Sequence, residues 1–332
     1  MMMNRAWQSG PATKTASLVG LAGLALTGAA LIANHRASKA ERRHPALGRF
    51  VTAGGARLHY IEQGRGPAVV FLHGNGAMVE DYLISGVFTR AAQRYRAIAF
   101  DRPGFGHSDR PRGRNWTAAA QASILPEALR LLSIDRAIVV GHSWGTLVAL
   151  ALALDYPRLV SGLVLGSGYY YPTPRMDVVL SSPSATPLLG DVICHTVAPF
   201  AGEAMAPSVL KKMFSPQGVA PHFLQQFPLA LCLRPSQIHA YAEDSSHMTT
   251  AAAALSPRYS SLFPPTVIMA GDADRIVDYR QAQRLHGAVR GSHLDLWPGA
   301  SHMIHHVDPG RFLHGIDIAA ERANAGVAAE PI

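Results

Sequence analysis

Uninterrupted apolar runs of three to five residues recur along the chain after residue 50, and stretches of helical periodicity separate them. Such runs are typical of parallel strands that a sheet buries on both of its faces. Their alternation with helices predicts an α/β fold with a doubly wound, mostly parallel sheet. Ligands bind beyond the carboxyl ends of strands in such sheets, so functional residues are expected directly after these runs. The runs occupy residues 68–72, 97–100, 137–140, 163–165 and 266–270.

Further patterns extend this fold at both ends. Residues 49–52 and 57–62 flank a Gly54-Gly55 pair, which predicts an antiparallel strand pair joined by a hairpin turn. Residues 293–297 are expected to form the last strand. Helical periodicity is found at about residues 78–94, 117–133, 145–155 and 279–289.

The positive charge of the chain is concentrated at its N-terminus. The 332 residues have a formal net charge of +8, and residues 1–49 contribute +6 of it, from seven basic side chains and Glu41. The remainder carries +2, which argues against a nucleic-acid-binding surface on the folded part. With 48% apolar residues and two cysteines, the composition excludes a disordered chain and a disulfide scaffold.

Residues 16–33 are dominated by Ala, Leu and Gly, and no ionisable side chain occurs between Lys14 and His35. A helix of this length reaches about 27 Å, close to the roughly 30 Å of a hydrocarbon core. We predict a single uncleaved membrane anchor, with a cleaved signal peptide of an exported protein and a soluble Ala-rich helix as alternatives. Positive-inside counting slightly favours a cytoplasmic-facing globular part. Residues 34–49 are expected to form a solvated basic linker.

The interval between Gly168 and Pro264 breaks the strand–helix alternation. It is rich in Pro, Met and aromatic residues, contains no convincing buried strand and is too long for a connection. We expect an inserted helical cap over the carboxyl edge of the sheet. The predicted organisation is therefore a membrane anchor and linker over residues 1–49, an α/β core over 50–168 and 264–332, and a cap over 169–263.

The strongest chemical signal is the pentapeptide Gly141-His142-Ser143-Trp144-Gly145, which follows an apolar run and precedes a helical pattern. G-x-S-x-G in a strand-to-helix turn is typical of a nucleophilic serine. Its glycines remove Cβ atoms where the strand and the helix crowd together, and the helix N-terminus supplies oriented N–H groups. We therefore predict Ser143 as a nucleophile.

A serine hydroxyl needs a base and an orienting acid to act as a nucleophile near neutral pH. His302 lies in the loop after the last predicted strand, at the carboxyl edge, and is the predicted base. The acid should follow the strand at 266–270, where Asp272 and Asp274 are available. Asp274 is favoured because its distance from Gly271 lets the loop bend back towards the histidine. The order Ser, Asp, His along the chain matches one known order of this triad.

The anionic intermediate of acyl transfer needs backbone donors. We predict the N–H group of Trp144, directly after the nucleophile, and that of Asn75 in the His-Gly-Asn-Gly loop after the first parallel strand. No cofactor is expected, because no G-x-G-x-x-G opens a helix and no P-loop occurs. No metal is expected either: His305 and His306 follow His302 closely, but we expect no acidic ligand close to them and assign His302 the role of base.

These motifs resemble those of the α/β-hydrolase fold superfamily, in particular the capped branch that contains esterases, epoxide hydrolases and haloalkane dehalogenases. The resemblance runs in order through nearly all of the globular part. It implies the same triad of Ser143, Asp274 and His302, with main-chain donors at Asn75 and Trp144. The matching segments are HGNG (73–76), DRPGFGHSDRP (101–111), GHSWG (141–145), AGDADRIV (270–277) and PGASH (298–302).

One residue departs from the dehalogenases and epoxide hydrolases that this sequence resembles, because those enzymes use Asp where this chain has Ser143. A serine alkoxide that attacked an sp³ carbon would leave an ether, whereas attack on an acyl carbon gives a hydrolysable ester. We therefore predict a serine hydrolase of carboxylic esters or related acyl compounds. Alternatives are C–C hydrolysis, lactone opening, perhydrolysis or acyl transfer on the same triad, and a ligand-sensing protein without catalysis.

The predicted partners are a small acyl substrate and the membrane. Aromatic and Pro residues of the cap, such as Tyr169, Phe214 and Phe223, favour an apolar substrate if they line the site, although they can also form the cap's own core. Cys194 and Cys232 both fall in the cap, where they are expected to be free thiols, with a disulfide between them as the alternative if the domain is exported. The oligomeric state is not specified by the sequence.

Overall fold

The computed structural model describes residues 11–174, 183–186 and 188–328. An eight-stranded sheet with the order β1-β2-β4-β3-β5-β6-β7-β8 forms its centre. β1 pairs antiparallel with β2 and β2 with β4, and all other neighbours are parallel, which confirms the predicted α/β fold. The strands are β1 Arg49–Ala53, β2 Ala56–Gln63, β3 Ala68–Leu72, β4 Arg96–Phe100, β5 Ala137–His142, β6 Val160–Gly166, β7 Thr266–Gly271 and β8 His293–Trp297.

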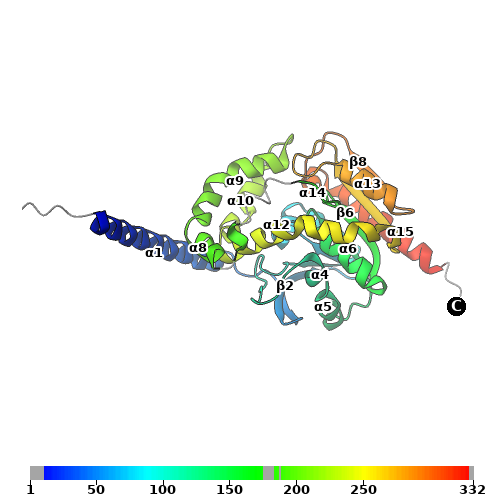
Figure 1. Ribbon diagram of the computed structural model, residues 1–332. Coiled ribbons are helices and arrows are strands. Elements are labelled where there is room, and N and C mark those ends of the chain that lie inside the picture. The colour runs from blue at the N-terminus through cyan, green and yellow to red at the C-terminus, as the bar shows by residue number, and fades with distance from the viewer. Residues whose placement is uncertain (1–10, 175–182, 187, 329–332) are drawn as a thin grey trace, which may run out of the picture.

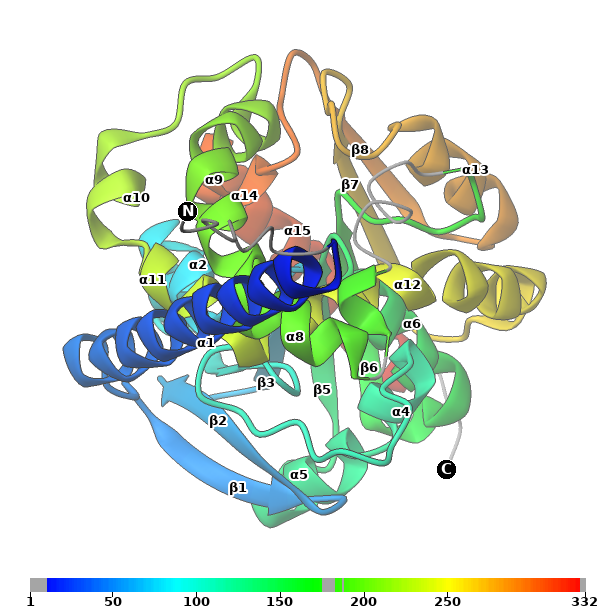
Figure 2. The ribbon, with the colours of Figure 1, turned by 60° about the vertical axis from the view of Figure 1, so that its left-hand side comes forward.

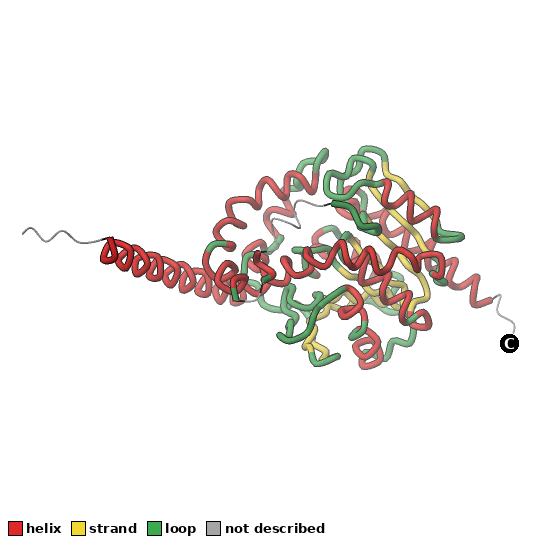
Figure 3. The backbone as a smooth tube through the Cα atoms, in the orientation of Figure 1, coloured by secondary structure: helices red, strands yellow, loops and turns green. Residues whose placement is uncertain are grey.

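Helices cover both faces of this sheet, as the tube in Figure 3 shows. Alternate side chains of β3 enter different apolar clusters: Val70 and Leu72 pack on one face, and Val69 and Phe71 on the other. This double burial explains why the strand is apolar at consecutive positions. The first face is covered by α4 Ala118–Ala122, α5 Leu125–Leu131, α6 Gly145–Asp155 and α13 Arg280–Ala288, and the second by α2 Val79–Ile84, α3 Val87–Ala91 and α15 Pro309–Ala328.

Two of the predicted helices are each divided in the structure. The pattern at 78–94 forms α2 and α3, because Gly86 between them has the left-handed φ of +78°. The pattern at 117–133 forms α4 and α5, with Pro126 in the first turn of α5. Proline lacks an N–H group and therefore favours the first turn of a helix, where no intrahelical hydrogen bond is lost.

Helices occupy the chain between β6 and β7, as predicted, and no residue described there belongs to a strand. We call this set the cap helices. The longest, α12, extends over Pro235–Leu255 and crosses the middle of the molecule in Figure 1. Its later part packs on the first face of the sheet through Met248, Ala252 and Leu255. The others are α8 Leu189–Thr196, α9 Ala198–Phe214, α10 Pro221–Gln226 and α11 Leu229–Cys232.

Helix α1, Pro11–Arg43, extends away from the globular part at its N-terminal end and meets the cap helices at its C-terminal end (Figures 1 and 2). Ala33 and Ala40 are buried there. Arg36 pairs with Glu203 of α9 at 2.8 Å. Glu41 accepts a hydrogen bond of 2.8 Å from Arg234, at the start of α12. Residues 34–43 therefore form the docked end of a helix rather than the solvated linker that we expected.

The prediction of a membrane anchor is wrong, and with it the predicted membrane partner and membrane location. Within the residues that the structure describes, no helix is long and apolar enough to cross a membrane. The apolar part of α1 ends at Ala33, where Asn34, His35 and Arg36 continue the same helix. Its C-terminal end packs against the cap helices instead, through buried Ala40 and the pairing of Arg36 with Glu203.

Candidate active site

Ser143 lies in a sharp turn between β5 and α6. Its φ is +51°, and its N–H group donates to the carbonyl oxygen of Gly166 in the neighbouring strand at 2.9 Å. The turn needs its glycines: a Cβ atom on Gly145 would lie 2.2 Å from the carbonyl oxygen of Leu72, and one on Gly141 would lie 2.8 Å from the carbonyl oxygen of Gly145. The close packing of strand and helix thus holds Ser143 in a left-handed conformation, half-buried at the start of α6.

His302 and Asp274 are brought together from two loops. The Nδ1 atom of His302 lies 2.7 Å from Oδ2 of Asp274, and both side chains are buried. The other carboxylate oxygen of Asp274 accepts hydrogen bonds from the N–H groups of Ile276 at 2.7 Å and Val277 at 3.0 Å. The carboxylate is therefore fixed on both sides, and Nε2 is left as the second functional nitrogen of His302.

Asp272, the other acid available after β7, has a different partner. Its Oδ1 atom accepts a hydrogen bond of 2.6 Å from the N–H group of Gly299, in the turn that leads to His302. Asp272 thus supports the loop, whereas Asp274 contacts the histidine.

The Ser143 turn and the His302 loop are adjacent. His142, directly before Ser143, has its Nε2 atom 3.0 Å from the carbonyl oxygen of His302. The two imidazole rings lie 5.0 Å apart, centroid to centroid. Since His142 and His302 are both buried, this contact fixes the loop against the end of β5.

The loop after β3 lies against the same turn. A Cβ atom on Gly74 would be 3.2 Å from the Cβ atom of Ser143. The neighbouring Asn75 donates from Nδ2 to the carbonyl oxygen of Tyr241 at 3.1 Å and to Oγ of Ser245 at 2.9 Å, both on α12. Trp144, the residue directly before α6, is fully buried. The two residues predicted to donate backbone N–H groups thus flank Ser143.

His73 holds this loop in place in its neutral form. Its Nδ1 atom is 2.8 Å from the carbonyl oxygen of Gly74, and Nε2 accepts a hydrogen bond of 2.9 Å from the N–H group of Arg102. Burial, together with the nearby Arg102 guanidinium, lowers the pKa of His73 to about 4. Arg102 is itself buried, and it donates to the carbonyl oxygens of His73 at 2.9 Å and Gly74 at 3.2 Å.

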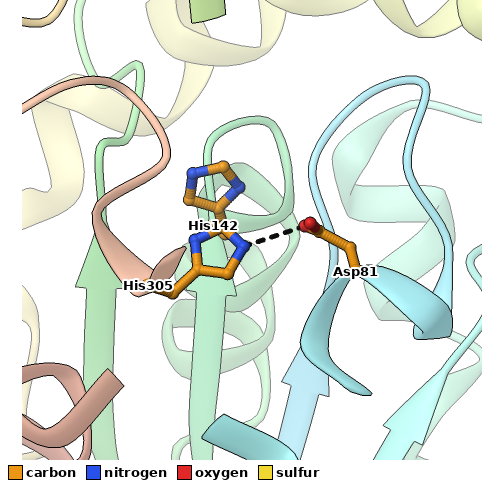
Figure 4. A group of neighbouring side chains, drawn as sticks. All are labelled: Asp81, His142 and His305. Atoms are coloured by element: carbon orange, nitrogen blue, oxygen red, sulfur yellow. Dashed lines mark hydrogen bonds and ion pairs between the residues drawn. The ribbon is translucent and has the colours of Figure 1, made fainter. Parts of the chain in front are cut away.

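A buried group behind Ser143 was not predicted from the sequence. Figure 4 shows Asp81 of α2 beside His305 and His142. The Nε2 atom of His305 lies 3.0 Å from Oδ2 of Asp81, and that of His306 lies 2.8 Å from Oδ1. The premise that no acidic residue accompanies these histidines is therefore wrong. Asp81 is separated from His305 by 224 positions, and no local pattern signals such a contact.

The electrostatics of this group favour an anionic Asp81 beside neutral His142 and His305. Burial acts to raise the pKa of Asp81, but the imidazoles of His305 and His306 hold it well below its usual range. Burial lowers the pKa values of His142 and His305. One ligand atom each of Asp81, His142 and His305 lies within 4.8 Å of the others, the donor set of a divalent cation. Both carboxylate oxygens already accept hydrogen bonds from imidazoles, whereas the Nδ1 atoms of His142, His305 and His306 are buried without a hydrogen-bond partner among the described residues.

A cavity of about 1050 Å³ lies elsewhere, between the C-terminal end of α1, the loop around residues 104–116 and the cap helices α8 and α12. Charged side chains line it, and Ser143 is not among its lining residues. Arg110 and Arg234, which face it, donate to Glu243 at 2.6 Å and to Glu41 at 2.8 Å respectively. The guanidinium of Arg110 therefore joins the core to the cap, and that of Arg234 joins the cap to α1.

The sequence is similar to that of known proteins over most of its length. A family model described as the alpha/beta hydrolase family matches residues 69–314. An uncharacterized protein of Mycobacterium tuberculosis is 30% identical over 274 residues, which cover 80% of this chain and 78% of that protein. Haloalkane dehalogenase 2 of the same organism is 30% identical over 145 residues, which cover 42% of this chain and 50% of the dehalogenase.

A solved structure gives the same picture of the fold. A thermophilic esterase from Thermogutta terrifontis superposes with a TM-score of 0.67, covering 83% of this chain and 99% of the esterase. The two sequences are 20% identical, so this likeness concerns the fold alone.

Proposed function

Because the chain belongs to the alpha/beta hydrolase family, we propose that it is a serine hydrolase that cleaves carboxylic esters or related acyl compounds. One observation carries this proposal: the 2.7 Å contact between Asp274 and His302 lies in the loop region adjacent to the strained turn of Ser143. A nucleophile, a base and an orienting acid are the parts that acyl transfer needs.

In the proposed reaction, Oγ of Ser143 attacks the acyl carbon while Nε2 of His302 takes its proton. Asp274 orients the imidazole and stabilises its charged form. The N–H groups of Asn75 and Trp144 donate to the oxyanion. The C–O bond to the alcohol then breaks, and His302 returns the proton to that leaving group. A water molecule, deprotonated by His302, then attacks the acyl carbon of the acyl-enzyme. The bond from that carbon to Oγ breaks, and His302 returns the proton to Ser143 as the acid leaves.

The identity of the nucleophile supports acyl chemistry over dehalogenation, although one relative is named a haloalkane dehalogenase. An attack of Ser143 on an alkyl carbon would form an ether, which has no carbonyl carbon for water to attack. An acyl-enzyme has one, so the cycle closes. Phe214 and Phe223 are buried and pack with Met303, the residue after His302, so an aromatic core of the cap lies against the His302 loop. In this proposal residues 169–263 act as the cap domain that selects the substrate.

Labelling with a fluorophosphonate probe, followed by peptide mass spectrometry, tests the nucleophile. We expect modification of Ser143 and its loss in Ser143→Ala. Ser208→Ala is the matched control, because Ser208 is exposed on α9 and its hydroxyl donates to Met205 of the same helix. A folded wild-type protein that stays unlabelled, and that hydrolyses no ester in a series of nitrophenyl esters of increasing chain length, would contradict the proposal.

The same ester series separates hydrolysis from the related reactions of this triad. Turnover is measured with and without an alcohol or hydrogen peroxide as acceptor. A hydrolase gives the free acid in every case, whereas an acyltransferase or a perhydrolase gives the new ester or the peracid. We expect the free acid.

A further inference from the structure

We propose that one turn of the cap helix α12, residues 241–245, positions both oxyanion donors. This inference rests on the proposed function and assigns to the cap a direct part in the chemistry, in addition to any part in substrate selection. The oxyanion donors are backbone N–H groups, and their side chains are therefore free to serve as anchors. Both anchors end on this turn.

The first anchor is the side chain of Asn75. Its Nδ2 group donates to the carbonyl oxygen of Tyr241 at 3.1 Å and to Oγ of Ser245 at 2.9 Å. A carbonyl oxygen can only accept, so this contact fixes which end of the Asn75 amide faces α12. Ser245 is 4% exposed, so the hydroxyl that accepts from Asn75 belongs to a buried residue. The orientation of Asn75, and with it the direction of its backbone N–H group, therefore depends on the position of α12 relative to the loop after β3.

The second anchor is the indole of Trp144. Its Nε1 group donates to the carbonyl oxygen of Asp244 at 2.8 Å, and the residue is fully buried. The guanidinium of Arg102 stacks on the ring with Cζ 4.5 Å from its centroid. The indole is thus held on one side by the cap and on the other by the core.

A third contact ties the same turn to the main chain of the donor loop. Asp244 accepts a hydrogen bond of 2.5 Å from Arg102, which also donates to the carbonyl oxygens of His73 and Gly74. Arg102 therefore lies between the loop that precedes Asn75 and the cap turn that holds its side chain. Oxyanion donors act only when they stand about 3 Å from the developing charge, so small displacements of α12 reduce catalysis.

Single substitutions on each side of these contacts test the inference, because all of them retain both backbone N–H donors. The variants are Asn75→Ala, Ser245→Ala and Trp144→Phe, of which the last removes the indole N–H group and keeps an aromatic ring. Ser246→Ala is the matched control: the hydroxyl of Ser246 donates to Glu243 within the same helix. We expect kcat for an ester to fall about tenfold or more in Asn75→Ala and Trp144→Phe, and less in Ser245→Ala, because Tyr241 still holds the amide.

The diagnostic measurements are the separation of kcat from KM and the affinity for an anionic tetrahedral adduct. A trifluoromethyl ketone forms such an adduct on a nucleophilic serine, and its affinity should fall in parallel with kcat while KM stays near the wild-type value. Thermal unfolding of each variant is measured alongside. The inference is overturned if the three variants match Ser246→Ala, or if kcat falls without any loss of affinity for the ketone.

Failure of the proposed function has a different signature. In that case the wild-type protein itself neither hydrolyses the ester nor is labelled at Ser143. A wild-type protein that is active and labelled, with variants that do not differ from the control, rejects the positioning role of α12 and leaves the serine hydrolase intact.

Discussion

Arg102 and Asp244 form an ion pair between the core and the cap, with Nη1 of the guanidinium 2.5 Å from Oδ2 of the carboxylate. Their side chains are 2% and 0% exposed. A charge buried to this degree is stable only when it is paired and its remaining hydrogen-bonding groups are satisfied. The pair therefore joins α12 to the loop after β4, and removing one partner leaves a buried charge without its counterion.

Asp244→Ala is expected to lower the free energy of unfolding by about 3–5 kcal/mol, the usual cost of breaking a buried ion pair. Urea denaturation followed by circular dichroism measures it. Glu203→Ala is the control, because Glu203 and its partner Arg36 are both more than half exposed and such a pair is worth about 1 kcal/mol or less. Equal decreases in the free energy of unfolding of the two variants would contradict the prediction that the buried ion pair stabilises the protein more than an exposed one does.

Asp274 and Asp272 offer a matched pair of substitutions in one loop. Asp274→Asn removes the carboxylate that orients His302, and we expect kcat for an ester to fall by about 10⁴-fold. Asp272→Asn keeps an oxygen that can accept the hydrogen bond from Gly299, so its kcat should stay within a few-fold of the wild type. The assay is ester hydrolysis under saturating substrate. A larger effect of Asp272→Asn would exchange the roles given to the two acids.

His73 should make the stability of the protein depend on pH. Its folded-state pKa is about 4 against an ordinary value of 6.5, so between these values the unfolded chain binds a proton that the folded protein does not. The stability from His73 is complete above pH 6.5 and is lost as pH falls towards 4, by about 3 kcal/mol in total. His73→Gln cannot titrate, and its free energy of unfolding should fall less than that of the wild type between pH 7 and pH 4.5. Parallel pH profiles of the two proteins would contradict this assignment.

The sequence could predict those parts of the fold and of the candidate site that depend on neighbouring residues. The apolar run of β3 predicts a strand buried on both faces. The structure agrees, because alternate side chains of β3 enter different apolar clusters. The close contacts that a Cβ atom on Gly141 or Gly145 would make follow from one strand-to-helix turn. The choice of Asp274 over Asp272 also rests on a short-range argument, the bend of a loop after β7.

Contacts between distant segments could not be predicted in this way. Asp81 meets His305 because α2 and α14 (Ile304–Val307) follow different strands whose carboxyl ends lie at one edge of the sheet. Asn75 contacts Ser245 because the cap helix α12 packs on the loop after β3, and no periodicity in the sequence near either residue predicts that packing. The prediction of a membrane anchor was wrong for a related reason. The apolar pattern of α1 does not reveal that the C-terminal end of the helix packs against the cap.

Glu80 provides a pH effect of the opposite sign to that of His73. Burial, and then the charge of Asp101, raises its pKa to about 7 from an ordinary value of 4.5. Its Oε2 atom is buried and has no hydrogen-bond partner among the described residues. The folded protein therefore binds a proton at Glu80 between pH 4.5 and 7 that the unfolded chain does not, and this contribution to stability is lost as pH rises through 7.

Glu80→Gln is neutral at every pH, so its free energy of unfolding relative to the wild type should rise by roughly 3 kcal/mol between pH 4.5 and pH 8. Urea denaturation of both proteins at these two pH values measures the change, and a constant difference between them would mean that Glu80 ionises in the folded protein as easily as in water.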